Sequence, residues 1–244
     1  MKDNFSAQAL GYANFRPHYP AEMIHYIIGQ VNDKGTALDV ATGNGQVALG
    51  LAAYFDKVYA SDISEKQLQH AETAPNIYYS VSSAENLGFD DESFDLITVG
   101  QAIHWFNFDA FYKEVNRLLK NDGVFAVLGY GLFSAGEEAD KVLQHLYKDI
   151  LGSYWDAERK YVDENYQTIP FPFKEIEVPG FENRFQWSIE QLLGYLNTWS
   201  AVQHYIRGNS VNPVDLVKSD LEQLWGDRGR EVVFPLLLRI GKKL

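Results

Sequence analysis

A turn with two glycines near residue 44 is the segment whose residue types and spacing best fit ligand binding. It reads Leu-Asp-Val-Ala-Thr-Gly-Asn-Gly-Gln-Val-Ala over residues 38–48, between a predicted strand, residues 36–40, and a predicted helix, residues 47–54. Glycine lets the backbone adopt positive φ and approach a ligand closely, and the open amides at a helix start favour a negative or polar group. Gly43 and Gly45 therefore predict a ligand-binding turn.

Two carboxylates accompany this turn. Asp62 ends the next predicted strand, residues 57–62, and a carboxylate at this place can accept hydrogen bonds from the hydroxyls of a ribose. Asp39 ends the strand before the turn, where its charge suits a cationic amine and does not suit a pyrophosphate. The strand context, the glycines and both acids together predict a cofactor that contains adenosine.

A dinucleotide is the alternative ligand for the same turn. Gly43-x-Gly45-x-x-Ala48 also satisfies the dinucleotide fingerprint, which keeps an NAD-linked oxidoreductase open. The charge of Asp39 counts against it. So does the absence from the chain of a Tyr-x-x-x-Lys pair, which one common class of dehydrogenases uses. A tight turn that binds nothing is the purely structural interpretation.

Gln101, His104 and Trp105 follow another predicted strand, residues 95–99. Ligands of open α/β sheets bind beyond the carboxyl ends of the strands, so this place suits a site. His104 is a candidate general base, Trp105 a candidate pocket wall, and Gln101 a candidate contact to cofactor or substrate. A structural core histidine and a plain core aromatic residue are the alternative interpretations.

Three further candidates, Tyr12, Arg16 and Tyr19, precede the first predicted strand. Arginine can bind a carboxylate through two parallel hydrogen bonds. We therefore expect Arg16 to contact an anionic group of cofactor or substrate. An ion pair with a surface acid is the alternative for this residue.

Hydrophobic patterning places these candidates on alternating strands and helices. Strand-like segments cover residues 36–40, 57–62, 77–81, 95–99 and 124–129, and helical periodicity covers residues 20–31, 47–54, 65–72 and 108–119. Such alternation builds a parallel sheet with helices on both faces. We expect an α/β protein with a doubly wound, Rossmann-like, mostly parallel sheet of seven strands.

The second half of the chain departs from this alternation. Helical patterns cover residues 136–161, 188–206 and 213–225, residues 232–240 are ambiguous, and strand-like residues 173–178 and 181–187 around Pro179-Gly180 predict an antiparallel edge pair. Ser188 and Gln191 form a capping-box pattern. We expect one domain over residues 1–244: an N-terminal lid and helix (1–35), a cofactor-binding core (36–130), a helical cap insertion (131–170), and edge strands with C-terminal helices (171–244).

The amino-acid composition limits the classes of ligand and partner that we expect the chain to bind. The chain has 244 residues, 46% of them hydrophobic, and a net charge of -12, which argues against nonspecific binding to nucleic acid. It has no cysteine, and its six histidines are dispersed, so we expect no metal site. It shows neither a signal peptide nor a membrane-spanning run, and we expect a cytoplasmic monomer or homodimer that acts on a small molecule.

Taken together, these motifs resemble those of class I S-adenosylmethionine-dependent methyltransferases. Asp39-x-Ala41-x-Gly43-x-Gly45 is similar to the first motif of that family, with alanine at its first glycine position. Asp62 matches the ribose-binding acid. Residues 83–89 match the segment beside the adenine, although Ser83 stands where aspartate is usual. The resemblance implies S-adenosylmethionine as cofactor, S-adenosylhomocysteine as product, and these cofactor-binding residues: Tyr12, Arg16, Asp39, Ala41, Thr42, Gly43, Asn44, Gly45, Asp62, Ile63, Ser83, Ala84, Glu85 and Gln101.

A narrower resemblance is to the branch of trans-aconitate methyltransferase-like small-molecule enzymes. It rests on Tyr12-x-x-Phe15-Arg16-Pro17-x-Tyr19-Pro20 and on Ala102-x-His104-Trp105-Phe106. It implies a small carboxylate as acceptor, and so O-methylation, with Tyr19, His104 and Trp105 at the substrate. An ionised carboxylate needs no base, whereas a phenol or a carbon acid would need one, and His104 is then the candidate catalytic residue. Besides the oxidoreductase, a cofactor-binding module of this fold without catalytic activity remains an alternative.

Overall fold

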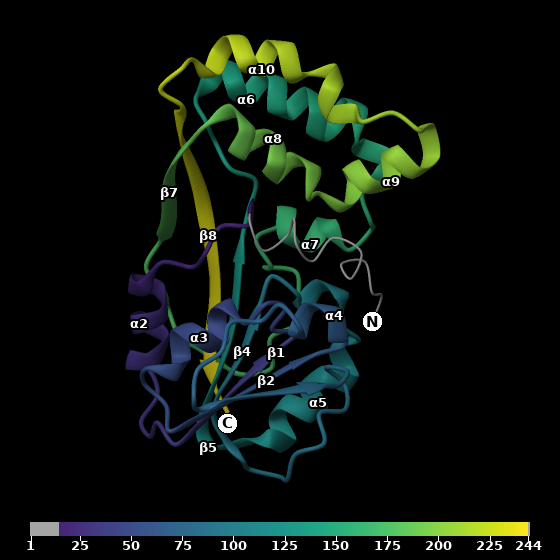
Figure 1. The fold of residues 1–244 in the computed structure, drawn as a ribbon. Helices are drawn as coiled ribbons and strands as arrows, with labels where there is room; N and C mark the ends of the chain where they lie inside the picture. Colours follow the sequence, from purple (N-terminus) through teal and green to yellow (C-terminus); the bar gives the residue numbers. More distant parts are fainter. Residues whose placement is uncertain (1–14, 244) are drawn as a thin grey trace.

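A curled sheet forms the centre of the protein, which a computed structural model describes over residues 15–243 (Figure 1). Within that range the sheet has eight strands. Five of them are parallel, in the order β3-β2-β1-β4-β5. Their bounds are Thr36–Val40 (β1), Lys57–Asp62 (β2), Ile77–Val81 (β3), Phe94–Gly100 (β4) and Leu119–Tyr130 (β5).

A long last strand completes the sheet on the far side of β5. This strand, β8 (Arg230–Lys242), runs antiparallel to β5 and carries both β6 (Lys174–Glu175) and β7 (Phe181–Trp187) on its other edge. The segment at residues 232–240, ambiguous in sequence, is therefore a strand. An antiparallel edge is confirmed, but three strands form it where a pair was expected, because β8 joins β6 and β7. The expectation of seven strands was therefore wrong by one among the described residues.

Helices cover both faces of the parallel strands, as expected for a doubly wound sheet. On one face, α2 (Ala21–Gly29) and α3 (Gln46–Ala52) pack with Ala37 and Leu96. On the other face, α5 (Phe108–Leu118) packs with Leu38 and Ile97. Neighbouring strand residues point to opposite faces, so the near-continuous apolar runs of β1 and β4 are buried on both sides. The short α4 (Glu65–Leu68) follows β2.

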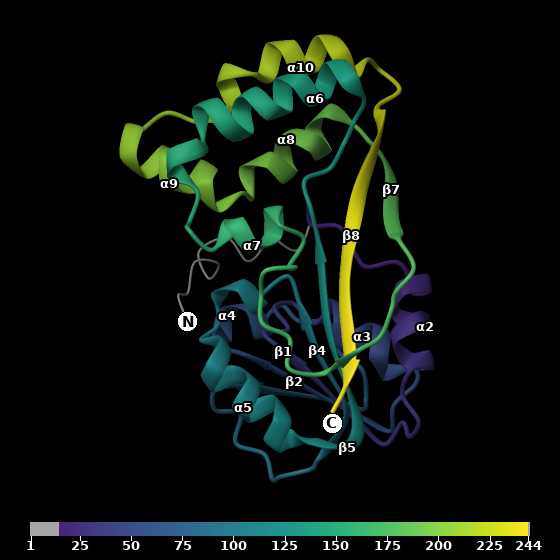
Figure 2. The same ribbon diagram turned by 180° about the vertical axis from the view of Figure 1, so that it is seen from behind.

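A helical cap lies beyond the carboxyl ends of the parallel strands. Figures 1 and 2 show α6, α8, α9 and α10 stacked there, with α7 between this stack and the sheet. The cap thus joins the predicted insertion at residues 131–170 with helices that follow β7. Its elements are α6 (Glu137–Gln144), η3 (His145–Ile150), η4 (Gly152–Tyr154), α7 (Arg159–Asp163), α8 (Ile189–Asn197), α9 (Ser200–Asn209), η5 (Pro213–Leu216) and α10 (Lys218–Trp225).

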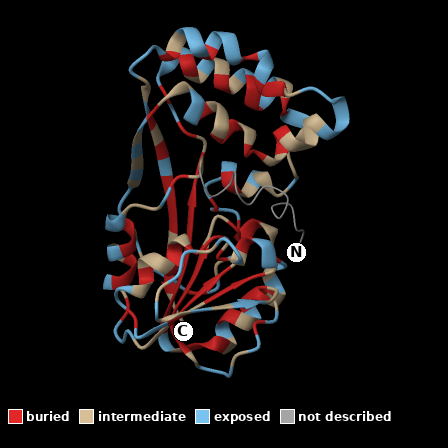
Figure 3. Cartoon of the chain, viewed as in Figure 1, coloured by how far each residue is buried: buried red, intermediate tan, exposed pale blue. Residues whose placement is uncertain are grey.

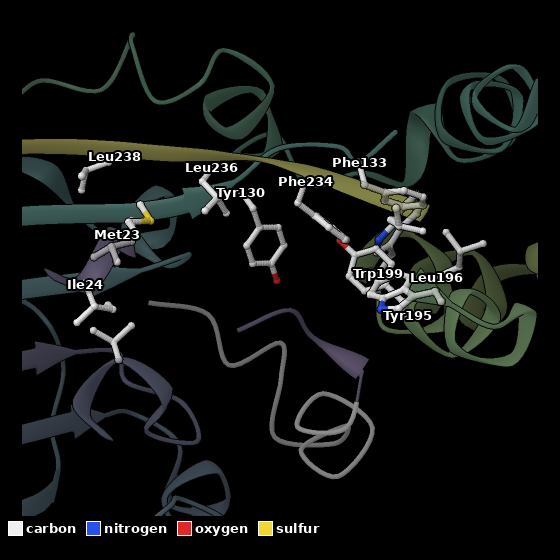
Figure 4. Packing of buried hydrophobic residues seen from close by; sticks show 14 of the residues in the cluster. Met23, Ile24, Tyr130, Phe133, Tyr195, Leu196, Trp199, Phe234, Leu236 and Leu238 are labelled. Atoms are coloured by element: carbon white, nitrogen blue, oxygen red, sulfur yellow. The ribbon is translucent and has the colours of Figure 1, made fainter. Parts of the chain in front are cut away.

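One hydrophobic cluster connects the cap to the sheet. It runs along β8 from Met23 on α2 to Leu196 and Trp199 in the cap (Figure 4). Phe234 lies in its middle, with its ring 5.6 Å from that of Tyr130 and 5.4 Å from that of Tyr195. Figure 3 shows this buried interior between the exposed outer surfaces of the helices. The cap therefore shares one hydrophobic core with the sheet.

Three expectations for the second half of the chain were wrong in detail. Residues 173–178 and 181–187 do not form a hairpin, because β6 and β7 pair in turn with the same edge of β8. The helix predicted at 136–161 breaks into α6, a π-helical turn, a 3-10 turn and α7. The helix predicted at 188–206 ends at Asn197, and extended backbone at Trp199 starts α9. The capping box at Ser188 is confirmed.

In the part of the chain that the structure describes, no helix is long and apolar enough to cross a membrane. The cytoplasmic location and the monomeric or homodimeric state stay predictions from sequence.

Candidate active site

The glycine turn lies between β1 and α3 and has an unusual backbone. Three of its residues have positive φ: Ala41 at 53°, Gly43 at 59° and Gly45 at 84°. This conformation costs an alanine about 1–2 kcal/mol, and glycine avoids most of that cost. A Cβ at Gly45 would also collide with the hydroxyl of Tyr79. Ala41, which replaces the family's first glycine, is therefore held in a strained conformation at the predicted site.

Asp62, at the end of β2, binds this turn directly. Its Oδ2 accepts a hydrogen bond of 2.9 Å from the Gly43 amide, and its Oδ1 accepts one of 2.8 Å from the Ser64 amide. Ser64 also caps α4. A carboxylate at the end of this strand is placed to accept hydrogen bonds from the hydroxyls of a ribose. The two amides fix the orientation in which Asp62 meets a ligand.

Asp39 is a buried carboxylate at the end of β1. It accepts hydrogen bonds from the hydroxyls of Thr42, at 2.5 Å, and Thr98, at 2.8 Å. Thr98 lies directly opposite on β4 in the strand register. Burial raises the pKa of Asp39 to about 6, against the opposing effect of the two hydroxyls. A cation placed beside this carboxylate would restore its ionised form.

A cavity opens at this edge of the sheet, and seven of the 14 predicted cofactor residues line it, together with Tyr19. Arg16, Tyr19, Asp39, Ala41, Thr42, Gly43, Asn44 and Gln101 are among the lining residues. The sequence reasoning missed five others, which are Pro17, Gln46, Val47, Gly100 and Tyr130. Ligands of this fold bind at the point where the strand order reverses, here between β1 and β4.

Six other predicted cofactor residues that the structure describes are not among those that line this cavity: Gly45, Asp62, Ile63, Ser83, Ala84 and Glu85. Besides Gly45 and Asp62, they belong to segments that continue the same edge of the sheet. Ser83 pairs with Asn86 in an isolated bridge just after β3. The side chain of Glu85 accepts a hydrogen bond from the Asn107 amide at the start of α5. Ile63 and Ala84 lie beside Asp62 and Ser83 in the chain, and Tyr12 falls outside the described residues.

Gln101 and Arg16 line both this cavity and a second one next to it. The Gln101 side chain accepts a hydrogen bond from the Tyr130 amide and donates one to the Tyr130 carbonyl, which ties the ends of β4 and β5 together. Arg16 donates to the Tyr130 hydroxyl at 2.9 Å and to the Thr198 carbonyl at 3.2 Å. Arg16 and Gln101 therefore form the boundary between the two cavities. This boundary lies where the sheet meets the cap.

The second cavity lies under the cap and joins aromatic with charged side chains. His104 and Trp105 line it, whereas Tyr19, also predicted at the substrate, lines the first cavity and not this one. The other lining residues come from the cap or from the boundary; they are Arg16, Gln101, Trp155, Asp156, Arg159, Trp199 and Ser200.

His104 is buried, and its protonated form is strongly disfavoured. Its Nδ1 lies 3.2 Å from the hydroxyl of Tyr166, and the two rings stack. Burial, together with the positive charges of Arg159 and Arg16, lowers the pKa of His104 to about 3. General bases work best with a pKa near the working pH, so an imidazole with this pKa is a poor base.

Arg159 points a guanidinium group at the same cavity. Its Nε donates to the Tyr147 hydroxyl at 2.7 Å and to Asp163 at 3.2 Å, and the group lies 4.8 Å from the centre of the Trp155 ring. Its two outer nitrogens make no hydrogen bond among residues 15–243. The structure thus fixes the inner edge of this guanidinium and leaves its outer edge available.

Comparisons with known proteins agree with this geometry. A family model described as a methyltransferase domain matches residues 38–127, which span β1 to β5. The "Putative methyltransferase" of Dictyostelium discoideum is 33% identical and aligns over 99% of this chain and 95% of its own length. The solved "Putative Type II Methyltransferase" of Anaeromyxobacter dehalogenans is 38% identical and has a TM-score of 0.87. The alignment covers 94% of this chain and 99% of that chain. The chain belongs to the methyltransferase family.

A more distant relative names the cofactor. It is the "Probable S-adenosylmethionine-dependent methyltransferase" of Saccharomyces cerevisiae, which is 23% identical over 91% of this methyltransferase and 89% of its own length. The family membership confirms the expected enzyme class and fold, and it does not favour the oxidoreductase.

Two groups of site residues carried no usable signal in the sequence. Arg159 and Asp156 belong to the cap, and only the folded chain brings them to the end of β4. Their one local pattern is the i,i+4 pair of Arg159 and Asp163, which is common on helix surfaces. Thr98 was recognisable only through its register with Asp39.

Proposed function

We propose that this methyltransferase forms methyl esters on a carboxylate of a small molecule. S-adenosylmethionine is the methyl donor, in agreement with the family, the turn motif and the name of the yeast relative. The proposal adds the identity of the acceptor. A carboxylate oxygen takes the methyl group from the sulfonium, and the products are a methyl ester and S-adenosylhomocysteine.

The residues of the first cavity fit this cofactor. Gly43 leaves open space where a Cβ would stand, so a ligand can approach the turn closely. The oriented carboxylate of Asp62 suits the ribose hydroxyls, and the buried carboxylate of Asp39 suits the amino group of the methionine part. An ammonium group beside Asp39 would also relieve the burial that raises its pKa.

The observation that carries the carboxylate proposal is the pair of guanidinium groups in the second cavity. Two guanidinium groups, those of Arg16 and Arg159, line it, and the outer edge of Arg159 is available. Guanidinium groups match carboxylates in geometry and charge. Through Arg16 and Gln101 this cavity adjoins the cofactor cavity, so an acid held there lies next to the methyl donor.

The state of His104 supports the same acceptor. A phenol or a carbon acid must lose a proton during transfer, and an imidazole with a pKa of about 3 is a poor acceptor for it. A carboxylic acid, with an ordinary pKa near about 4, is already ionised at pH 7. The positioning of such an acceptor, worth up to roughly 7–11 kcal/mol in well-oriented reactions, is then the main task of the protein. We propose that neutral His104 orients the acceptor and does not remove a proton.

The narrower resemblance to trans-aconitate methyltransferase-like enzymes is consistent with this proposal. Of its two motifs, the first supplies Arg16 and Tyr19, which line the first cavity. The second motif supplies His104 and Trp105, which line the second cavity.

Alkaline lability of the product tests the proposal. The enzyme is incubated with methyl-labelled S-adenosylmethionine and separate panels of small carboxylic acids, phenols and amines, and the products are then treated with mild base. Methyl esters release volatile labelled methanol, whereas methyl ethers and N- or C-methyl groups do not. We expect volatile label from the acids only. Base-stable label from phenols or amines would contradict the proposal, as would no label from any acid.

A further inference from the structure

Asp156 is a carboxylate in the second cavity that the structure leaves unsatisfied. Its side chain is 13% exposed, and its Oδ2 is buried without a hydrogen-bond partner among residues 15–243. The nearest cationic candidate is His204, whose Nδ1 lies 3.8 Å away and is hydrogen-bonded to the Tyr154 carbonyl at 2.9 Å. A buried polar atom without a partner costs about 1–3 kcal/mol, and more for a charged group. A ligand that donates a hydrogen bond here would recover that cost.

The obvious partner within the cap is bound elsewhere. Arg159 lies three residues after Asp156, yet its Nε is held by Asp163 and Tyr147. Its guanidinium group also stacks against the rings of Tyr147 and Trp155. The cavity therefore contains an acceptor, at Asp156, and separate donors, at the outer edge of Arg159.

Three indole rings complete the cavity. Trp155 and Trp199 lie with ring centres 5.5 Å apart and inclined by 50°, and Trp105 stands beside His104. The Trp155 Nε1 is occupied by a hydrogen bond to the Tyr147 carbonyl. Walls of this kind suit a flat apolar group, because aromatic surfaces pack with large contact area and few lost rotamers.

We infer that the acceptor is a hydroxy or amino acid with a flat apolar group, and that Asp156 accepts a hydrogen bond from its hydroxyl or ammonium group. This deepens the proposed function and rests on it: the guanidinium groups attract the carboxylate, and Asp156 selects among acids by the donor beside it. An acid without such a donor would leave Asp156 unsatisfied in a dry cavity. Hydrogen bonds to charged groups predict a preference of about 10- to 100-fold for the donor-bearing acid.

Calorimetric titration with matched probes tests the inference. The full-length enzyme, saturated with S-adenosylhomocysteine, is titrated with 3-phenyllactate, phenylalanine and 3-phenylpropionate, which differ only in the group next to the carboxylate. We expect 3-phenyllactate, phenylalanine or both to bind about 10- to 100-fold more tightly than 3-phenylpropionate. Equal affinities for all three would overturn the inference, as would no binding of any of them.

Variants separate the role of Asp156 from general effects on the cap. Asp156→Ala should remove the preference by weakening the donor-bearing acids while S-adenosylhomocysteine binds as in wild type. Asp156→Asn keeps an acceptor oxygen and should retain part of the preference. Asp149→Asn is the matched control, because Asp149 is an exposed cap carboxylate, 69% exposed, that pairs with His145. An unchanged preference in Asp156→Ala would overturn the inference.

The two proposals can fail separately. If acids yield alkali-labile methyl groups but the three probes bind equally, the role of Asp156 is wrong and carboxyl methylation stands. If the preference depends on Asp156 but no acid yields alkali-labile label, carboxyl methylation is wrong and the binding role of Asp156 stands.

Discussion

Replacing Asp39 with asparagine should stabilise the unliganded protein at neutral pH while it weakens cofactor binding. Burial raises the pKa of Asp39 from its ordinary value of 3.8 to about 6. At pH 7 the ionised side chain therefore destabilises the folded state by about 3 kcal/mol relative to the unfolded chain. Asparagine has nearly the same shape and carries no charge. The hydroxyls of Thr42 and Thr98, which donate to Asp39, can rotate to bind its amide.

The stability difference between Asp39→Asn and the wild-type protein should depend on pH. A carboxyl whose pKa is raised in the folded state destabilises the fold fully at pH values above about 6, and the effect disappears as pH falls toward 3.8. The increase in the free energy of unfolding caused by Asp39→Asn should thus be largest at pH 7 to 8 and should fall to about half by pH 5. Urea denaturation of both proteins without ligand, repeated across this pH range, measures it.

A second buried carboxylate provides the control. Asp95 accepts hydrogen bonds from the Thr36 amide and from Lys120, each at 2.8 Å, so Asp95→Asn should destabilise the protein at pH 7. For cofactor binding the two variants should behave the other way round, because Asp39 lies at the cofactor site and Asp95 does not. Calorimetry with S-adenosylhomocysteine should show about 10- to 100-fold weaker binding for Asp39→Asn and little change for Asp95→Asn. An Asp39→Asn protein that is less stable than wild type at pH 7, or whose stability difference does not depend on pH, would refute the reasoning.

Three further substitutions test the turn and its surroundings. Asp62→Ala should weaken S-adenosylhomocysteine binding at least about tenfold while circular dichroism stays unchanged, because a charged hydrogen-bond partner is lost; unchanged affinity rejects the ribose role. Ala41→Gly should stabilise the protein by about 1 kcal/mol in urea, because φ is 53° there, whereas Ala52→Gly in α3 should destabilise it; a loss of stability in Ala41→Gly refutes the strain argument. Gly129→Ala should cost about 1–3 kcal/mol, because its Cβ would lie 2.6 Å from the Tyr166 ring. That cost should shrink in a Tyr166→Ala background, and an equal cost in both backgrounds would show that the ring is not its cause.

The parallel half of the sheet was predictable because its signals are local. β2 and β3 have the predicted bounds, since each is a short apolar segment ended by polar or turn residues. The turn after β1 carries its own glycines, and Asp62 is recognisable by its place at the end of β2. The fold class and the cofactor-binding edge follow from these short-range patterns.

The other edge of the sheet was not predictable in the same way. Pro179 and Gly180 indicate a turn, but β6 and β7 both pair with β8, whose residues lie more than 40 positions later in the chain. Strand register set by such a distant partner leaves no local pattern. Pro235 also obscured β8, although its neighbours are apolar and buried.

The substrate side of the site shows a similar limit. His104 follows β4 and lines the second cavity, and its role stays a prediction, whereas its low pKa depends on burial and on Arg159, which the cap contributes. A general base was therefore a reasonable interpretation of the sequence that the folded environment does not support.

Calorimetric titration of the purified protein with S-adenosylhomocysteine, with NADH in parallel, tests the central claim most directly. The arrangement of Asp39, Asp62 and the glycine turn predicts micromolar binding of S-adenosylhomocysteine and no binding of NADH. Binding of NADH without S-adenosylhomocysteine would contradict the assignment of the cavity.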